Sequence, residues 1–190
     1  MIEMRLHGRG GQGAVLAGNI LAAALSREGR HVVAIPSFGF ERRGAPVASF
    51  LRFDEREIRQ FTNIYAPDCV LCIDPTVGRA VNIFVGVKPA STWVQCTSKP
   101  LAALDFPEAI ARVGLCDAVA ISSDIFGRTI TNTIMLGALA KTTGYVSLDA
   151  LRSVIEDSEF RDAGLQQNLD GLARGYEETV VHQIERRVAA

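Results

Sequence analysis

The start of the chain constrains the fold more than any other segment, because it combines a strand, a glycine turn and a helix. Residues 2–7 alternate apolar and polar side chains, as half-buried strands do. Four glycines follow within residues 8–13, and residues 14–25 are rich in Ala and Leu, which favour helices. This succession is typical of the first βαβ unit of a nucleotide-binding α/β sheet.

Short apolar runs farther along the chain predict the other strands. They cover residues 31–35, 45–53, 70–73, 80–87, 92–96 and 118–121. The run at 70–73 is nearly all apolar, which is typical of a central parallel strand covered on both faces. With 190 residues, 48% of them apolar, the chain is long enough to bury a core, and we expect residues 1–190 to form a single domain.

The last third of the chain is predicted to be helical. Residues 125–142 contain only two charged side chains, and Ser147 followed by Asp149 is typical of a helix start. From Leu165 to Ile184, apolar side chains recur every three or four residues, as on one face of an amphipathic helix. We therefore predict an α/β fold: a single Rossmann-like domain with a mostly parallel sheet flanked by helices and a helical C-terminal third.

Two of the predicted helices contain uncharged stretches, at residues 14–25 and 129–140. A helix of this kind is either enclosed in the core or covered by another subunit. Both interpretations remain open, and the second would make the chain part of a larger assembly.

Net charge and hydropathy exclude several classes of function. The formal net charge is −1, so bulk electrostatics would hold neither nucleic acid nor a membrane surface, and we expect neither as a partner. Residues 10–26 carry no charge, but Gln12, Gly18 and Asn19 interrupt them, and they fall short of the ~20 residues that span a bilayer. We therefore expect no membrane span, no secretory leader and a cytoplasmic location.

The four cysteines are predicted to be buried, reduced thiols. Cys69, Cys72, Cys96 and Cys116 lack the spacing of a disulfide framework. Cys69 and Cys72 form a CxxC pattern, but they lie on a predicted strand, where positions three apart face opposite sides of the sheet. We therefore expect no metal site and no iron–sulfur cluster built from this chain alone.

The glycine turn is the first candidate binding site. Gly8, Gly10 and Gly13 match G-x-G-x-x-G, with Gly11 and Gln12 between them. Glycines permit a tight turn, and free N–H groups at the following helix start favour an anionic group. A classical NAD site also needs an acidic residue at the end of the second strand, and the predicted strand lacks one. The alternative is that the glycines only let the helix pack closely on the sheet.

A charged loop is the second candidate. Residues 36–46 contain Glu41, Arg42 and Arg43 bracketed by Gly and Pro, as in an ordered surface loop. Adjacent arginines are suited to clamp a phosphate or carboxylate, and Glu41 is suited to fix one of them by a bidentate pair. A salt bridge at a subunit contact is the alternative. Because the loop follows the second strand, we expect it at the same sheet edge as the glycine turn.

No complete catalytic set is evident in the sequence. His7, His31 and His182 are scattered, and no nucleophile elbow, P-loop or HExxH motif occurs. Asp74 and Asp124 are predicted to follow strands, a position typical of caps and of functional acids alike. We interpret both as caps.

Four segments carry a resemblance to a known family. They are residues 8–22, residues 37–44, residues 132–138 (NTIMLGA) and residues 168–176 (NLDGLARGY). In this order they are similar to the gamma subunit of the 2-oxoacid:acceptor oxidoreductases, which include pyruvate:ferredoxin oxidoreductase. The resemblance extends over nearly the whole chain.

The resemblance implies a heteromeric enzyme that converts a 2-oxoacid and coenzyme A to an acyl-CoA and CO₂. It implies alpha and beta partner subunits that bind thiamine diphosphate and Mg²⁺, and a ferredoxin-like subunit with [4Fe–4S] clusters. Electrons would pass to ferredoxin or NAD(P). For the gamma chain it implies no catalytic residue and no cofactor of its own, with Gly8–Gly13 and Glu41–Arg43 in a structural, subunit-contact or CoA-site role.

Two other functions remain open at this point. One is a free-standing NAD(P)-binding Rossmann dehydrogenase, and the other is an assembly module without a ligand. Saturable nicotinamide binding by the chain would identify the first. CoA-dependent turnover that survives changes throughout residues 36–46 would identify the second.

Overall fold

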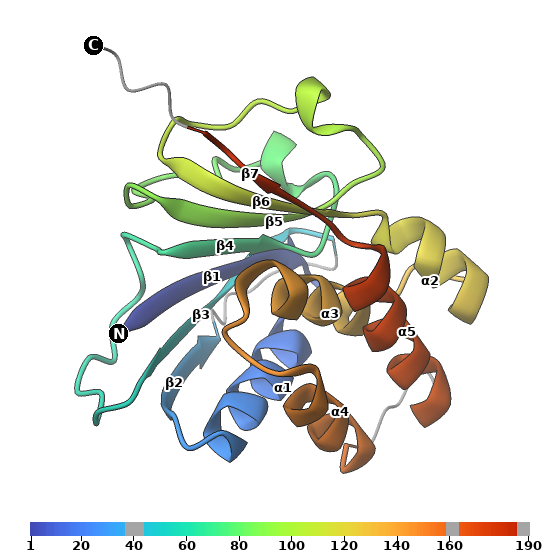
Figure 1. Cartoon of the computed structure of the whole chain (residues 1–190), viewed down its shortest axis with the longest axis horizontal. Helices are drawn as coiled ribbons and strands as arrows, with labels where there is room; N and C mark the ends of the chain where they lie inside the picture. Colours follow the sequence, from blue (N-terminus) through green and yellow to red (C-terminus); the bar gives the residue numbers. More distant parts are fainter. Residues whose placement is uncertain (37–43, 159–163, 186–190) are drawn as a thin grey trace.

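A computed structural model describes residues 1–36, 44–158 and 164–185 of the chain (Figure 1). Strands and helices follow one another in the order β1 (Ile2–Arg9), α1 (Ala14–Arg27), β2 (His31–Pro36), β3 (Pro46–Asp54), β4 (Cys69–Cys72), β5 (Ser91–Cys96), β6 (Ile110–Cys116), α2 (Ala118–Phe126), α3 (Asn132–Thr143), α4 (Leu148–Glu156), α5 (Leu165–Glu178) and β7 (Val180–Gln183). Two short 3₁₀ turns, η1 (Val77–Arg79) and η2 (Leu101–Ala103), lie between strands.

All seven described strands join one sheet, in the order β2-β3-β1-β4-β5-β6-β7. The neighbours β1, β4, β5 and β6 pair in parallel. Strand β3 is antiparallel to β1 and to β2, and β7 is antiparallel to β6. Five of the seven strands therefore point the same way, which confirms the predicted mostly parallel sheet.

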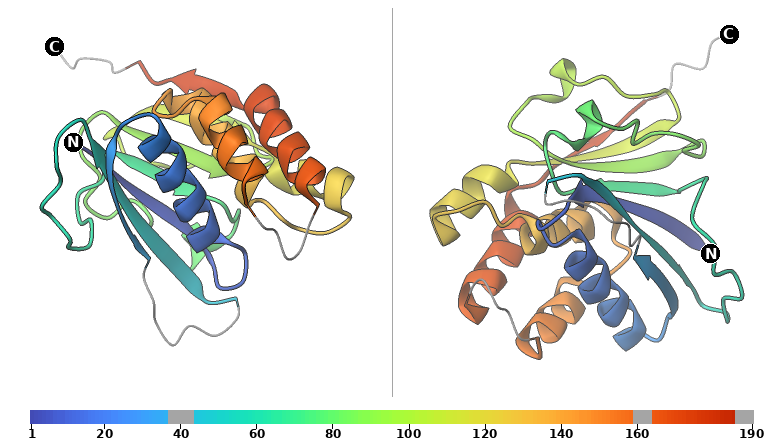
Figure 2. Two further views of the ribbon diagram at one scale, coloured as in Figure 1. Left: turned by 90° about the horizontal axis from the view of Figure 1, so that it is seen from below. Right: turned by 180° about the vertical axis from the view of Figure 1, so that it is seen from behind.

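The five described α-helices lie on the same side of this sheet (Figure 2), where α1 and α3 pack on the strands and α2, α4 and α5 pack mainly against other helices. Their buried side chains share a core with strand residues such as Met4, Leu6 and Leu71. The opposite face is covered by loops around η1 and η2, whose Phe84 and Phe106 flank Trp93. The predicted helices thus flank the sheet on one side, and loops do so on the other. None of the described helices combines the length and the apolar character needed to span a bilayer.

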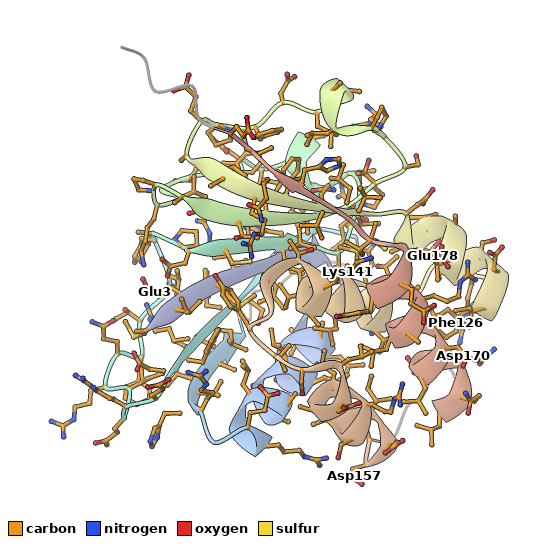
Figure 3. All side chains as sticks on the ribbon, viewed as in Figure 1. Glu3, Phe126, Lys141, Asp157, Asp170 and Glu178 are labelled. Atoms are coloured by element: carbon orange, nitrogen blue, oxygen red, sulfur yellow. The ribbon has the colours of Figure 1, made fainter. Side chains whose placement is uncertain are left out.

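On the helix-free face, hydrogen bonds between charged side chains and loop residues connect two loops to the amino-terminal end of β1. Glu3, which lies at this end of the strand, is labelled in Figure 3. Arg52 is almost fully buried, and its Nε donates to Glu3 Oε1 at 2.8 Å. The same guanidinium donates to the carbonyl oxygens of residues 62 and 63. Lys88 Nζ donates to Glu3 Oε2 at 3.0 Å and to Asp68 Oδ2 at 2.9 Å. We call Glu3, Arg52, Asp68 and Lys88 the Glu3 network.

Two of the predicted strands are wrong, because local turn and capping chemistry outweighs the apolar pattern there. Residues 80–87 form turns after η1, where Asn82 Oδ1 accepts from the Phe84 N–H in an Asx turn. Residues 118–121 begin α2, because the Asp117 side chain accepts from the Ala120 N–H as an N-cap. The helical prediction for residues 125–142 is confirmed for 132–142, which lie in α3, but Gly127, at φ +65°, ends α2, and residues 128–131 separate the two helices.

Helices α3 and α5 approach each other at backbone distance. A Cβ on Gly137 would overlap the Leu172 carbonyl oxygen, and a Cβ on Gly175 would overlap that of Ile134. Thr133 Oγ1 also donates to Asn168 Oδ1 at 3.1 Å. The two late segments that carry the family resemblance, 132–138 and 168–176, therefore form one interface within the chain.

Candidate functional site

The glycine turn joins β1 to α1 at the carboxyl edge of the sheet, beside the end of β4. A Cβ on Gly8 would lie 2.8 Å from Ile73 Cγ1, so a larger residue would displace the chain that follows β4. Gly11 and Gly13 adopt φ +87° and +80°, which only glycine occupies without strain. Because β3 and β4 lie on either side of β1, the turn sits at the point where the strand order reverses, which is where open α/β sheets bind ligands.

The Gln12 side chain ties the turn to the end of β4. Its Oε1 accepts from the Arg9 N–H at 3.0 Å, and its Nε2 donates to Asp74 Oδ2 at 2.6 Å. Asp74, with 5% of its surface exposed, also accepts from the backbone N–H and the hydroxyl of Thr76. Asp74 therefore closes an Asx turn with Thr76 and does not cap η1, whose N-cap is Thr76. Its carboxylate also holds the glycine turn through Gln12. Asp124, in contrast, lies within α2 and pairs with Arg174, so it follows no strand.

Arg9 connects three segments of chain. Its Nε lies 3.3 Å from Asp74 Oδ1 and 3.0 Å from Thr76 Oγ1, and its Nη1 donates to the Gly44 carbonyl oxygen at 2.9 Å. The Gly10 N–H donates to the Ala45 carbonyl at 2.8 Å, and the Gly44 N–H donates to the Gly10 carbonyl at 3.0 Å. We call Arg9, Gln12, Asp74 and Thr76 the Asp74 cluster. It fixes the glycine turn against both β4 and the start of β3.

The Asp74 carboxyl group stays ionised in this cluster. Burial alone raises its pKa, but the hydrogen bonds from Thr76 and Gln12 and the charge of Arg9 outweigh burial and hold the pKa below its ordinary value. Neither the role of Arg9 nor the link between Gln12 and Asp74 follows from the sequence alone. The available signal was an arginine inside the glycine turn, at the same sheet edge as an acid after β4.

Asn132 lies against the glycine turn from the other side. It is the first residue of α3, has 6% of its surface exposed, and its Oδ1 accepts from the Thr133 N–H at 2.9 Å. A Cβ on Gly13, the N-cap of α1, would lie 2.5 Å from Asn132 Nδ2. The preceding residue, Thr131, donates its hydroxyl to the Ile73 carbonyl at 2.7 Å. The starts of α1 and α3 are therefore neighbours at the carboxyl edge.

The charged loop can be placed only at its end. Glu41, Arg42 and Arg43 lie outside the described residues, so their clamp role stays a prediction. Gly44, directly after them, is hydrogen-bonded to Gly10 and Arg9, as described above. The loop therefore re-enters the described chain at the same sheet edge as the glycine turn.

A cavity of about 750 Å³ begins at this edge of the sheet and extends over the helix-free face. Thr76 of the Asp74 cluster lines it, together with Trp93 and Gln95 of β5 and Lys99 beyond the strand. The sheet edge thus offers space for an extended ligand next to the cluster.

The cysteines and histidines lie apart from this site or are buried. Cys69 packs in the core on the helix side and Cys72 on the other, which confirms that the CxxC thiols face opposite ways. Burial raises the pKa of the Cys72 thiol to about 12. Burial, followed by the charge of Arg5, lowers the pKa of His7 to about 4. Within residues 1–36, 44–158 and 164–185, no three His, Cys, Asp or Glu side chains are placed to hold a metal ion.

Comparison with known proteins gives consistent matches along the chain. The family described as pyruvate ferredoxin/flavodoxin oxidoreductase matches residues 3–178. The gamma subunit of NADH-dependent phenylglyoxylate dehydrogenase from Aromatoleum evansii is 62% identical over 190 residues, 100% of both chains. The common gamma subunit of the pyruvate/ketoisovalerate oxidoreductases from Thermococcus litoralis is 42% identical over 186 residues, covering 97% of this chain and 100% of the relative.

A solved structure matches the fold as well. The PORC subunit of pyruvate oxidoreductase from Thermotoga maritima superposes with a TM-score of 0.81 at 34% identity. The superposition covers 96% of this chain and 98% of that subunit. Sequence and fold therefore point to the same relatives over almost the full length.

Proposed function

Because the chain belongs to the pyruvate ferredoxin/flavodoxin oxidoreductase family, as a gamma subunit of its 2-oxoacid oxidoreductase complexes, we propose that its complex oxidises the aromatic 2-oxoacid phenylglyoxylate. Phenylglyoxylate, coenzyme A and NAD⁺ would give benzoyl-CoA, CO₂ and NADH. One observation carries this choice: identity is 62% to the phenylglyoxylate dehydrogenase subunit, against 42% to a pyruvate/ketoisovalerate subunit, with both relatives covered end to end.

Within the complex, the chain has a structural and CoA-positioning role. The glycine turn, Gly8–Gly13, is held by hydrogen bonds of the Asp74 cluster at the sheet edge where open α/β folds bind ligands, next to a cavity large enough for an extended ligand. Arg42 and Arg43 would contact a CoA phosphate or a partner subunit. Thiamine diphosphate with Mg²⁺ is assigned to alpha and beta partners, and the [4Fe–4S] clusters to a ferredoxin-like partner.

The substrate is tested on the complex purified from its native cells through an affinity tag on this chain. We expect thiamine diphosphate-binding and iron–sulfur subunits to co-elute, and NAD⁺ to be reduced when phenylglyoxylate and CoA are both supplied. Omission of CoA is the control for the acyl acceptor. Faster NAD⁺ reduction with pyruvate or 2-oxoisovalerate than with phenylglyoxylate would contradict the proposed substrate.

The role of the charged loop is tested in the same complex. We expect Arg42→Ala with Arg43→Ala to raise the KM for CoA or to weaken assembly. The matched control is Arg56→Ala with Arg59→Ala, which removes two arginines from an exposed loop after β3. If the double loop variant leaves assembly and the KM for CoA unchanged, the loop has no CoA role and the ligand-free assembly alternative gains support.

A further inference from the structure

Cys96 and Cys116 lie directly opposite each other on the neighbouring parallel strands β5 and β6 (Figure 1). Each cysteine is the last residue of its strand. The Thr97 N–H donates to the Cys116 carbonyl oxygen at 2.8 Å, so the two strands stay paired at this position. Neighbouring strands lie about 4.8 Å apart, which is within the Cα–Cα range of about 4.4–6.8 Å that a disulfide bridges.

Both thiols lie on the same side of the sheet. The two cysteines belong to the core on the helix side, and at most 1% of the surface of either is exposed. The backbone N–H of Ala118, two residues after Cys116, is a hydrogen-bond partner of the Cys96 thiol. The Cys96 side chain therefore reaches from β5 toward the end of β6. Side chains that leave neighbouring backbones in the same direction satisfy the geometric requirement for a disulfide.

No other cysteine is placed to pair with these two. All four cysteines of the chain lie among the described residues, and all four are free. Cys72 faces the helix-free side of the sheet. Cys69 shares the helix side, but it lies opposite Thr92, which is four residues, or about 13 Å, along β5 from Cys96. The fold therefore selects one cysteine pair.

We propose that Cys96 and Cys116 form a reversible disulfide between β5 and β6 when the folded chain meets hydrogen peroxide. One thiolate attacks the peroxide: an S–O bond forms, the O–O bond breaks, and the departing hydroxide takes up a proton to become water. The other thiolate then attacks the sulfenic sulfur: an S–S bond forms, the S–O bond breaks, and a second water leaves. Two thiols thus lose two electrons and two protons, and one peroxide becomes two waters.

Burial makes the first of these steps slow. It raises the pKa of the Cys116 thiol to about 11 and that of the Cys96 thiol to about 12, so both are protonated at neutral pH. Because the thiolate is the nucleophile, we expect oxidation to be faster in a mildly alkaline medium. The second step is expected to be rapid, since the register already holds the two sulfurs side by side.

The disulfide would connect two segments at the carboxyl edge of the sheet. Thr97 and Lys99, which follow β5, line the cavity on the helix-free face. Asp117, which follows β6, is the N-cap of α2. Oxidation would therefore restrain part of the cavity wall relative to the start of α2. This inference does not depend on the substrate of the complex.

The pair is tested on the full-length chain, which is reduced, freed of reductant and treated with hydrogen peroxide at mildly alkaline pH. Remaining thiols are blocked with N-ethylmaleimide in denaturant, and the unreduced digest is analysed by mass spectrometry. We expect two of the four thiols to be lost and one pair of peptides to be linked through Cys96 and Cys116. Dithiothreitol should restore all four thiols.

Two variants and one condition serve as controls. The double variant Cys69→Ser with Cys72→Ser keeps the proposed pair and should form the same link. Cys116→Ser should form no link to Cys96. Oxidation of the wild type in denaturant should instead favour Cys69 with Cys72, because loop-closure entropy favours the pair nearest in sequence once the fold is lost.

Any of four results would overturn the proposal. They are four free thiols after treatment of the folded chain, a link between any other two cysteines, a sulfinic acid at Cys96 or Cys116 without a link, and a link that forms equally well in denaturant. The peptide map of the wild type decides among these outcomes even if Cys116→Ser fails to fold.

Discussion

Arg9 and Asp74 show how much of the site depends on single side chains. The two residues are 65 positions apart in sequence, yet their ion pair aligns the glycine turn with the end of β4. Thr76 and Gln12 complete the set of donors around one buried carboxylate. An uncharged side chain at position 74 would leave the donors of Arg9, Gln12 and Thr76 facing a weaker hydrogen-bond acceptor.

We expect Asp74→Asn to lower the free energy of unfolding at neutral pH by about 1–3 kcal/mol, because buried donors lose a charged acceptor. Urea unfolding of the purified subunit measures this. The control, Asp124→Asn, removes an exposed carboxylate that pairs with Arg174, and it should cost less than about 1 kcal/mol. An equal cost at both positions would contradict a special role for Asp74.

The same comparison predicts a dependence on pH. The folded-state pKa of Asp74 is lowered, so its stabilisation is complete above the ordinary pKa of an aspartate and is lost as pH falls through the folded value. The difference in unfolding free energy between the wild type and Asp74→Asn should therefore shrink as the medium becomes acidic. A difference that stays constant down to strongly acidic pH would show that the carboxylate charge is not its cause.

At the scale of elements, α3 and α5 approach at backbone distance at Gly137 and Gly175, beside the hydrogen bond between Thr133 and Asn168. We expect Gly175→Ala to lower the free energy of unfolding by about 1–3 kcal/mol or more, since the added methyl group overlaps the Ile134 backbone. The matched control is Gly78→Ala, where the nearest atom to the new Cβ is 3.7 Å away and the contact is ordinary. Thermal unfolding of the two variants should separate them by several degrees, and equal melting temperatures would rule out the tight contact.

The elements that the sequence predicted correctly are those whose signal is local. The strands at 31–35, 45–53, 70–73 and 92–96 are confirmed, and so is the helix start at Ser147, whose hydroxyl accepts from the Ala150 N–H. Strand β6 was missed because Arg112 and Gly114 interrupt its apolar pattern, and Gly114 is required where Thr142 of α3 packs against it. Strand β7 was missed because Val180 and Ile184 continue the spacing of the preceding helix.

In the candidate site, too, the local features were predicted from the sequence and the long-range contacts were not. The glycine turn was found because its residues are adjacent in sequence. Its contacts with Asp74, Thr76 and Asn132 were not found, because they bring together segments more than 60 positions apart. Such contacts follow from strand order, which no local pattern encodes.

At the scale of the whole molecule, the Glu3 network holds together the first strand, the third strand and two loops on the helix-free face. Burial raises the pKa of Glu3, but Lys88 and Arg52 outweigh it and keep the pKa below its ordinary value. Burial lowers the pKa of Lys88, but Asp68 and Glu3 outweigh it and raise the pKa. The network therefore stabilises the fold between two limits: it weakens as pH falls through the folded pKa of Glu3 and as pH rises through that of Lys88.

We expect Arg52→Met to cost about 3 kcal/mol of unfolding free energy, because it leaves Glu3 with only the half-exposed Lys88 and frees two loop carbonyls. The control, Arg30→Met, breaks an exposed pair with Glu55 and should cost less than about 1 kcal/mol. Denaturant unfolding compares them. Hydrogen exchange should also show the loop at residues 55–68 losing protection in Arg52→Met alone.

The glycine contact between α3 and α5 also bears on how this lineage can diverge. A helix interface made of side chains can change in sequence, because a larger residue on one helix is compensated by a smaller residue opposite it on the other. Where backbone meets backbone at Gly137 and Gly175, no smaller partner exists, so neither helix can compensate for a change in the other. We expect these two segments to be inherited together and nearly unaltered. They would mark common descent more reliably than the glycine turn, which unrelated nucleotide-binding folds reach independently.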